Sequence, residues 1–364
     1  MYTLIIRTGE AEIRASEYIS SDILNDIFPI IEITRGRKRT IDEVAYFPFE
    51  SRLEKLSKIF KGKKVGIALT NEKLLSSKEI DELNTPDEGY KKWVDFLLEL
   101  KRRNIFSEIV PVLALYSKDE DFEMNFYLQV EKLQKYFSTI IYRSPIVDEF
   151  VYDDLDLITN KLSLGNTQIL IDCGYTPQAS HKNVAEKVSK RISNLKEMLR
   201  HYEKNISYIV ASTSFPNNVN DLGGGDTDTY QISSVELHEV VSQIHKDVIY
   251  GDYGSINPQR NDGIRMARGW IPRIDVPLER EVFYYRQRRP KGVTAYSTTY
   301  VSVAKQVIKD SRFPMNLATK NWGVQQIIDC TKAAPASSPS FWISVRMNIH
   351  VEQQVLRMRK MINE

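Results

Sequence analysis

The feature that most constrains the fold is an alternation of short apolar runs, rich in β-branched residues, with longer segments of helical periodicity. Eight runs are predicted strands, at residues 3–8, 28–34, 64–70, 109–115, 139–145, 168–174, 206–214 and 248–255. The clearest amphipathic segments between them lie at 90–104, 125–137, 184–205 and 233–246. Strands that alternate with helices in this way form parallel sheets. The sequence therefore predicts an α/β protein built from βα units.

The number of these units favours a closed barrel. Eight units in residues 1–255 match a (β/α)8 TIM-barrel-like fold in count and size, although an open, doubly wound sheet uses the same units and is the alternative. The pattern then changes: residues 270–290 alternate like antiparallel strands, while 292–310 and 341–362 have helical periodicity. We expect a C-terminal α+β elaboration at 256–364, packed on the barrel, with its last helix completing the outer ring.

Composition limits the class of protein. The 50 Lys and Arg residues nearly balance the 48 Asp and Glu residues, so any nucleic-acid-binding surface must be local. The only two cysteines, Cys173 and Cys330, exclude a disulfide framework and fit a reducing compartment. No apolar run approaches the length of a membrane span, and the N-terminal segment lacks a signal-peptide pattern. We expect a cytoplasmic protein without a membrane partner.

Polar residues stand where the predicted strands end. In a parallel barrel these ends meet at one mouth, so their side chains are expected to share a pocket. The candidate catalytic residues are the carboxylates Glu32, Asp172 and Asp252. The candidate ligand-binding residues are Arg7, Arg35, Arg37, Asn71, Tyr142, Arg143, Ser212, Ser214 and Tyr253.

These residue types allow more than one chemistry. Carboxylates can bind a divalent cation such as Mg²⁺ or Mn²⁺, or act as an acid and base pair. Arginines favour an anionic ligand, because a guanidinium binds phosphate or carboxylate through two parallel hydrogen bonds. A buried pair such as Arg7 with Glu32 could also be purely structural. An anion-binding site and a metal-assisted hydrolase of phosphoester or glycosidic bonds both remain open, as does the question of catalysis.

The segment FPNNVNDLGGGDTDTYQ, at 215–231, follows the seventh predicted strand. Barrels often bind phosphate there, and the three glycines could expose backbone donors. Because Asp221, Asp226 and Asp228 would repel phosphate, a lid, a metal-assisted site or a plain loop are the alternatives. The chain has no P-loop, no GxSxG, no HExxH and no GxGxxG after a strand, so it lacks the standard nucleotide and hydrolase motifs.

A local basic patch lies between residues 260 and 291, where arginines alternate with aromatic residues. This combination is typical of surfaces that bind nucleic acid or an acidic partner, although a solvated ribbon of paired charges would look similar. The candidate nucleic-acid or partner-binding residues are Arg273, Arg286, Arg288 and Arg289.

The stretches YTLIIRTGEAEIRA (2–15) and FPIIEITRGR (28–37) resemble the phage-type "beta protein" family of bacteria, phages and mobile elements. GDYG (251–254) and WISVRMNIH (342–350) are similar to later parts of that pattern. The resemblance implies a component of a phage-defence or mobile-element system, and it carries over no catalytic residues. A non-catalytic scaffold for a separate effector enzyme is a further alternative.

Overall fold

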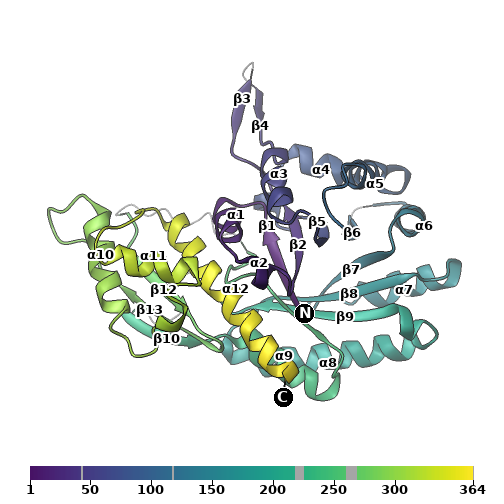
Figure 1. The fold of residues 1–364 in the computed structure, drawn as a ribbon. Coiled ribbons are helices and arrows are strands. Elements are labelled where there is room, and N and C mark those ends of the chain that lie inside the picture. The colour runs from purple at the N-terminus through teal and green to yellow at the C-terminus, as the bar shows by residue number, and fades with distance from the viewer. Residues whose placement is uncertain (42–43, 117–118, 218–224, 260–268, 364) are drawn as a thin grey trace.

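The main sheet is a nearly closed barrel of parallel strands. The structure, a computed structural model, describes residues 1–41, 44–116, 119–217, 225–259 and 269–363 (Figure 1). The eight strands are β1 (Tyr2–Arg7), β2 (Ile27–Ile33), β5 (Lys64–Leu69), β6 (Glu108–Pro111), β7 (Thr139–Pro145), β8 (Asn166–Tyr175), β9 (Ile206–Thr213) and β11 (Ile249–Asp252). They pair in the order β6-β5-β2-β1-β11-β9-β8-β7. A parallel bridge between Val112 and Ile141 joins the two ends. The barrel prediction is confirmed, and the open doubly wound alternative is wrong.

Helices cover the outside of this sheet (Figure 1). They are α1 (Glu10–Glu17), α2 (Ser21–Leu24), α3 (Glu50–Ile59), α4 (Lys78–Leu83), α5 (Asp87–Arg102), α6 (Phe122–Tyr136), α7 (Phe150–Lys161), α8 (His181–Met198) and α9 (Ser233–Ile244). Short 3-10 turns lie at Lys73–Leu75, Gln178–Ser180, Arg200–Asn205 and Met315–Leu317. In α6, Phe126, Val130 and Leu133 are fully buried, because their spacing places them on the one face that meets the sheet.

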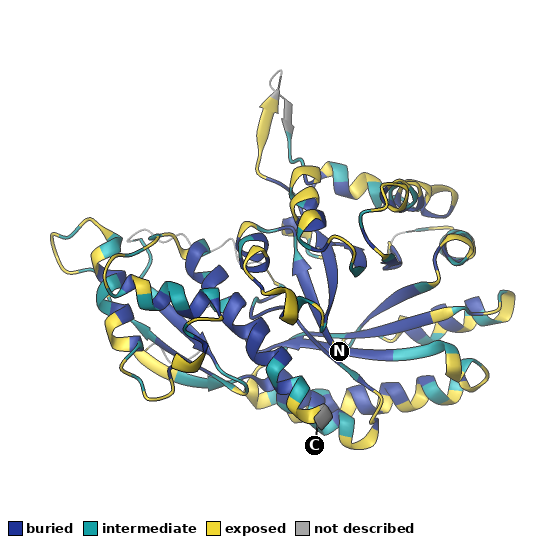
Figure 2. Cartoon of the chain, in the orientation of Figure 1, coloured by how far each residue is buried: buried dark blue, intermediate teal, exposed yellow. Residues whose placement is uncertain are grey.

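The strand pleat separates two hydrophobic cores. Inward-facing residues fill the barrel: Ile5, Phe28, Ile30, Ala68, Val110, Val112, Ile141, Leu170, Ile209 and Ala211. The alternate residues, such as Leu4, Ile6 and Ile31, pack outward against the helices in a larger core. Figure 2 shows that the central parts of the barrel strands are buried. Successive residues of a strand therefore point alternately to the barrel axis and to the helices. We call the odd or even position of a residue along its strand its parity.

A small hairpin, β3 (Arg39–Ile41) with β4 (Val44–Tyr46), projects from the barrel after β2 (Figure 1). At its root the Gly36 N–H donates to the Phe47 carbonyl at 3.2 Å. The backbone of Pro48 passes so close that a Cβ on Gly36 would lie 1.7 Å from the Pro48 carbonyl oxygen. None of the eight predicted strands covers β3 or β4, so the sequence pattern missed this hairpin.

The C-terminal part contains an antiparallel sheet, as the alternation over 270–290 predicts. Strands β12 (Arg273–Pro277) and β13 (Glu281–Arg286) pair with each other, and β10 (Thr227–Gln231) pairs with β13. β10 comes from the segment 215–231, which was predicted to be a loop or lid, so that prediction missed a strand. Residues 218–224 of this segment, with Asp221, lie outside the described residues, as do 260–268 of the basic patch.

Three helices complete the chain: α10 (Tyr296–Val307), α11 (Trp322–Cys330) and α12 (Pro339–Asn363). Trp342, Val345 and Ile349 of α12 pack with the antiparallel sheet in a third core, which we call the C-terminal core, whereas its Met347, Val351 and Val355 join the core outside the barrel. The division near residue 255 and the role of α12 in the outer ring stay predictions. None of the described helices is long and apolar enough to cross a membrane.

Candidate functional site

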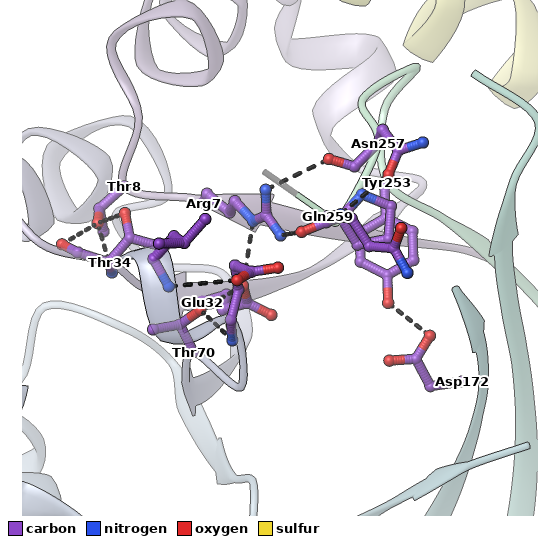
Figure 3. Close-up of polar contacts among 12 residues, drawn as sticks. Arg7, Thr8, Glu32, Thr34, Thr70, Asp172, Tyr253, Asn257 and Gln259 are labelled. Atoms are coloured by element: carbon purple, nitrogen blue, oxygen red, sulfur yellow. Dashed lines mark hydrogen bonds and ion pairs between the residues drawn. The ribbon is translucent and has the colours of Figure 1, made fainter. Parts of the chain in front are cut away.

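Four charged side chains converge at the mouth of the barrel, and Arg7, Glu32 and Asp172 of this set are labelled in Figure 3. Arg7, Glu32, Arg143 and Asp172 each stand two residues beyond an inward-facing apolar residue of their strand, so the pleat turns all four toward the barrel axis. Glu32 is 1% exposed. A carboxylate at this depth stays charged only when other groups compensate for the lost water.

The Glu32 carboxylate is fully engaged by neighbouring strands. Its Oε1 accepts hydrogen bonds from Arg7 Nε and Thr70 Oγ1, both at 3.1 Å. Its Oε2 accepts one from Arg143 Nη1 at 2.7 Å. These contacts link β1, β2, β7 and the end of β5 across the mouth.

The Asp172 carboxylate has an equally full set of donors. Its Oδ2 accepts from Arg143 Nε at 2.8 Å, and its Oδ1 accepts from the Tyr253 hydroxyl at 2.5 Å and the Gly174 N–H at 2.9 Å. Arg143 also donates to the Tyr253 oxygen through Nη2 at 3.0 Å. One guanidinium therefore bridges both carboxylates and the tyrosine.

Electrostatics keep the Glu32 carboxylate ionised and the Tyr253 phenol protonated. Burial alone would raise the pKa of Glu32, but the charges of Arg143 and Arg7 lower it by a larger amount, so the pKa falls below its ordinary value. Burial raises the pKa of Tyr253, and the Asp172 charge adds to that, so the phenol stays protonated as a donor. Two arginines face two carboxylates, and we call these four groups with Tyr253 and Thr70 the mouth network.

The mouth network also positions a loop. Arg7 Nη1 donates to the carbonyl of Asn257 at 3.4 Å, and its Nη2 donates to the carbonyl of Pro258. Asn257 in turn donates through Nδ2 to the Phe215 carbonyl at 2.8 Å. The segment after β11 is thereby fixed to the barrel rim.

Asp252 does not join the mouth network. Its side chain points outward to α12, where it accepts hydrogen bonds from the hydroxyls of Tyr2 and Tyr250 and lies 2.7 Å from His350 Nε2. Burial would raise the pKa of Asp252, but His350 and these hydrogen bonds hold it below its ordinary value. The prediction that Asp252 shares a pocket with Glu32 is corrected here. Asp252 stands one residue before the inward-facing Tyr253, so the pleat turns the Asp252 side chain outward.

The same correction applies to Tyr142 and Ser212. Tyr142 faces the helices and donates to Asp154 of α7, while Ser212 pairs in register with Asp252 and shares its outward orientation. Ser214 is buried, and its hydroxyl has no hydrogen-bond partner among the described residues.

The remaining predicted ligand-binding residues lie at the periphery. Asn71 is exposed beyond β5. The Arg35 guanidinium lies 5.5 Å from the centre of the Phe47 ring, and Arg37 forms an exposed ion pair with Glu10 at 2.7 Å. None of the three bonds to Glu32 or Asp172 within the part of the chain that the structure describes.

The predicted carboxylates do not build a metal centre. No three His, Cys, Asp or Glu groups among the described residues are arranged to hold a metal ion. Glu32 and Asp172 direct their oxygens to arginine, threonine and tyrosine donors, and Asp252 lies on the other side of the barrel wall. Thr70 belongs to the mouth network and Asn257 contacts it, and the sequence predicted neither residue. Parity would have found Thr70, because it stands two residues beyond the inward-facing Ala68.

A second site lies between the barrel rim and the C-terminal sheet. It is a cavity of about 490 Å³, which we call the arginine–aromatic cavity. Its lining includes Asn217, Tyr230, Asn257, Trp270, Arg273, Asp275, Arg286, Tyr300, Trp342 and Arg346. Of the predicted partner-binding residues, Arg273 and Arg286 line it. Arg288 is exposed outside it, and Arg289 lies 4.0 Å from the centre of the Tyr296 ring.

Two arginines of the cavity are held in place by the Asp275 carboxylate, whereas Arg286 lies 3.9 Å from Asp226. Arg273 Nε donates to Asp275 Oδ1 at 2.7 Å, and Arg346 Nη1 donates to Asp275 Oδ2 at 3.3 Å. Arg346 is also anchored to the Ser255 carbonyl at 2.8 Å. The lining thus carries three arginines and one aspartate, so its balance is positive.

The fold and these sites define a (β/α)8-barrel-like protein with a charge-balanced mouth and a basic, aromatic cavity beside it. The beta protein family matches residues 2–356, so the chain belongs to this family, as the resemblance predicts. Protein beta of Enterobacteria phage P4 is 25% identical over 359 residues, which cover 97% of this chain and 92% of the phage protein. The chain is thereby related to a phage protein over nearly its whole length.

Proposed function

We propose that this protein binds single-stranded nucleic acid in the arginine–aromatic cavity, as a component of a phage-defence or mobile-element system. The observation that carries the proposal is the lining of that cavity, which combines flat aromatic rings with arginines. Its volume of about 490 Å³ is in the range of small-ligand sites. Such a site accommodates one or two nucleotides of a strand.

The aromatic side chains suit nucleobases. Trp270 stacks on Tyr296 with 3.9 Å between ring centres and is only half-buried, so it is a rigid ring that a base can reach. Tyr300 and Trp342 stack on each other at 4.8 Å and are buried, so they form a rigid wall behind it. Stacking of a base on an aromatic side chain contributes about 1–3 kcal/mol and tolerates any base. Sequence-independent binding of an unpaired strand follows from this chemistry.

The polar groups suit the backbone of such a strand. A phosphate can bind to the arginines of the cavity, which are Arg273, Arg286 and Arg346. A guanidinium donates hydrogen bonds to phosphate oxygens just as Arg273 and Arg346 donate to the Asp275 carboxylate. The Tyr230 hydroxyl is buried and has no hydrogen-bond partner among the described residues. Burial raises its pKa, so this phenol remains a donor for a ligand oxygen.

The mouth network supports the cavity and does not bind the strand. Its two arginines are neutralised by Glu32 and Asp172, which weakens the case for an anionic ligand at the mouth itself. Arg7 instead holds Asn257, a residue of the cavity lining. No observation favours a metal-assisted hydrolase over this binding role.

Tryptophan fluorescence tests the proposal. A short oligodeoxythymidylate should quench the fluorescence of the full-length protein, and Trp270→Leu and Trp342→Leu should each remove part of the quenching. Trp322→Phe is the matched control, because Trp322 stacks on Tyr18 outside the cavity. Affinity should fall steeply with salt, as phosphate contacts require.

Three outcomes would contradict the proposal: no quenching at low salt, equal effects of the cavity and control variants, or preference for duplex. Co-purification of a protein that protects Trp270 from quenching by iodide would assign the cavity to a protein partner and support the scaffold alternative. The biological role is tested by deleting the gene from its native host, which should change the plating efficiency of phages. An unchanged efficiency across a phage panel would remove the defence role.

A further inference from the structure

A basic groove lies between α1, α3 and the root of the β3–β4 hairpin. Its volume is about 270 Å³. The groove, which we call the α1–α3 groove, is lined by Glu10, Ile13, Arg14, Glu17, Arg37, Arg39, Pro48, Ser51, Arg52 and Lys55. Five cations and two carboxylates therefore face one small volume.

Most of these cations lack a counter-charge. Arg37 is paired with Glu10 at 2.7 Å. Arg14, Arg39 and Lys55 form no ion pair with any residue of the described ranges. Like charges held together without partners repel one another, so an anion that enters the groove relieves that repulsion.

The groove is also held in shape before any ligand binds. Arg52 Nη1 donates to the carbonyls of Thr8 at 3.3 Å and Arg35 at 3.2 Å, so its guanidinium has a fixed position. The Nη1 of Arg14 is buried and has no hydrogen-bond partner among the described residues. A buried donor without an acceptor is costly, and an anionic oxygen would satisfy it. The close approach of Gly36 to Pro48 fixes the hairpin root that carries Arg37 and Arg39.

We infer that the α1–α3 groove binds the phosphates of an oligophosphate ligand, either a nucleoside polyphosphate or the backbone of a nucleic acid. Guanidinium and ammonium groups are the usual donors to phosphate oxygens, and several of them together distinguish an oligophosphate from a single anion. The volume fits a few phosphates without a deep base pocket. This inference does not depend on the arginine–aromatic cavity.

Calorimetric titration of the full-length protein with inorganic tripolyphosphate at low ionic strength is the direct test. Binding should be detected, and Lys55→Glu should weaken it about tenfold or more. Lys58→Glu is the matched control: it makes the same charge change on the same helix, one turn further on, at an exposed residue paired with Glu54. The control should change the affinity by less than about twofold.

Arg39→Glu provides a second variant, because Arg39 is exposed on the hairpin strand and its replacement leaves the barrel core untouched. Absence of tripolyphosphate binding, or equal losses for the Lys55 and Lys58 variants, would overturn the inference. Adenosine triphosphate and an abasic oligodeoxynucleotide are then compared as competitors of tripolyphosphate. The one that displaces tripolyphosphate at the lower concentration identifies the source of the phosphates. Trp270→Leu should leave tripolyphosphate binding intact, so this test and the fluorescence test can fail separately.

Discussion

Glu32 is the residue on which the barrel mouth depends most, since its buried carboxylate takes hydrogen bonds from Arg7, Thr70 and Arg143. Glu32→Gln removes the charge but keeps the shape, and leaves two arginines short of a counter-charge. Breaking a buried ion pair from one side costs about 3–5 kcal/mol. We expect a loss of that size in the free energy of unfolding, measured by urea denaturation at neutral pH.

The control for this prediction is Glu10→Gln. Glu10 pairs with Arg37 at 2.7 Å, but both side chains are exposed, so water and salt screen their attraction. An exposed pair contributes about 0–1 kcal/mol. Equal losses for the two variants would mean that the mouth network is no more stabilising than a surface ion pair.

His238 gives the fold a pH dependence. Burial lowers its pKa to about 4, below the ordinary value of 6.5, while its Nε2 lies 3.2 Å from the Val248 carbonyl. Between these values the unfolded chain binds more protons, so stability falls as the pH falls. By about pH 5 the loss amounts to about 2 kcal/mol.

The measurement compares urea denaturation of the wild type and His238→Gln at pH 7 and about pH 5. The wild type should lose more stability over this interval than the variant. Asp154, whose burial raises its pKa to about 6, acts in the opposite direction but is common to both proteins. Parallel pH profiles for the two proteins would disprove the effect of His238.

At the scale of single residues, the odd or even position of a residue along its strand predicts whether its side chain joins the site. The sequence places Arg7, Glu32, Arg143 and Asp172 at strand ends. The period of two, applied in each strand from its own inward-facing residue, would have assigned all four to the barrel axis; these residues are Ile5, Ile30, Ile141 and Leu170. The same count assigns Asp252 outward. The partner of Asp252 could not be foreseen, because His350 is 98 residues away in the chain and is brought there only by the packing of α12.

Secondary-structure elements could be predicted where their buried positions are apolar and recur at a regular spacing in the sequence. The eight barrel strands are apolar because both of their faces are covered, so each predicted run overlaps an observed strand, although the ends differ, most at β6 and β11. The strand β10 has the sequence TDTYQ, with an exposed first half, and lies at the edge of its sheet. Its strand conformation comes from pairing with β13, which local sequence cannot reveal. The hairpin of β3 and β4, with three residues in each strand, carries too short a pattern.

The hairpin root gives a prediction at this scale. Gly36→Ala would place a Cβ 1.7 Å from the Pro48 carbonyl oxygen, so the backbone must move. Forcing an added group into a packed site costs about 1–3 kcal/mol. We expect that loss of stability, together with faster hydrogen exchange at the hairpin amides, measured by mass spectrometry. Gly165→Ala should cost less, because its Cβ would meet only the end of the Gln134 side chain. Equal costs would show that the Gly36 contact is not restrictive.

At the scale of the whole molecule, α12 joins the core outside the barrel to the C-terminal core. Trp342, Val345 and Ile349 lie on the face that meets the C-terminal core, and Met347 and Val351 lie on the face that meets the core outside the barrel. One rigid helix cannot leave one core without disturbing the other. The two parts of the chain should therefore unfold together, although each has its own sheet and core.

Val345 and Val351 make a matched pair for testing this coupling, since both are fully buried valines of α12 that face different cores. Each change to alanine should cost about 1–3 kcal/mol through the cavity it leaves. Hydrogen exchange at rising urea concentration should show α5 and α11 becoming exchange-competent at the same midpoint, and either variant should lower both midpoints equally. If Val345→Ala lowered only the α11 midpoint, the C-terminal part would unfold alone and α12 would not couple the cores. Joint unfolding would in turn explain how the arginine–aromatic cavity, lined from both parts, keeps its shape.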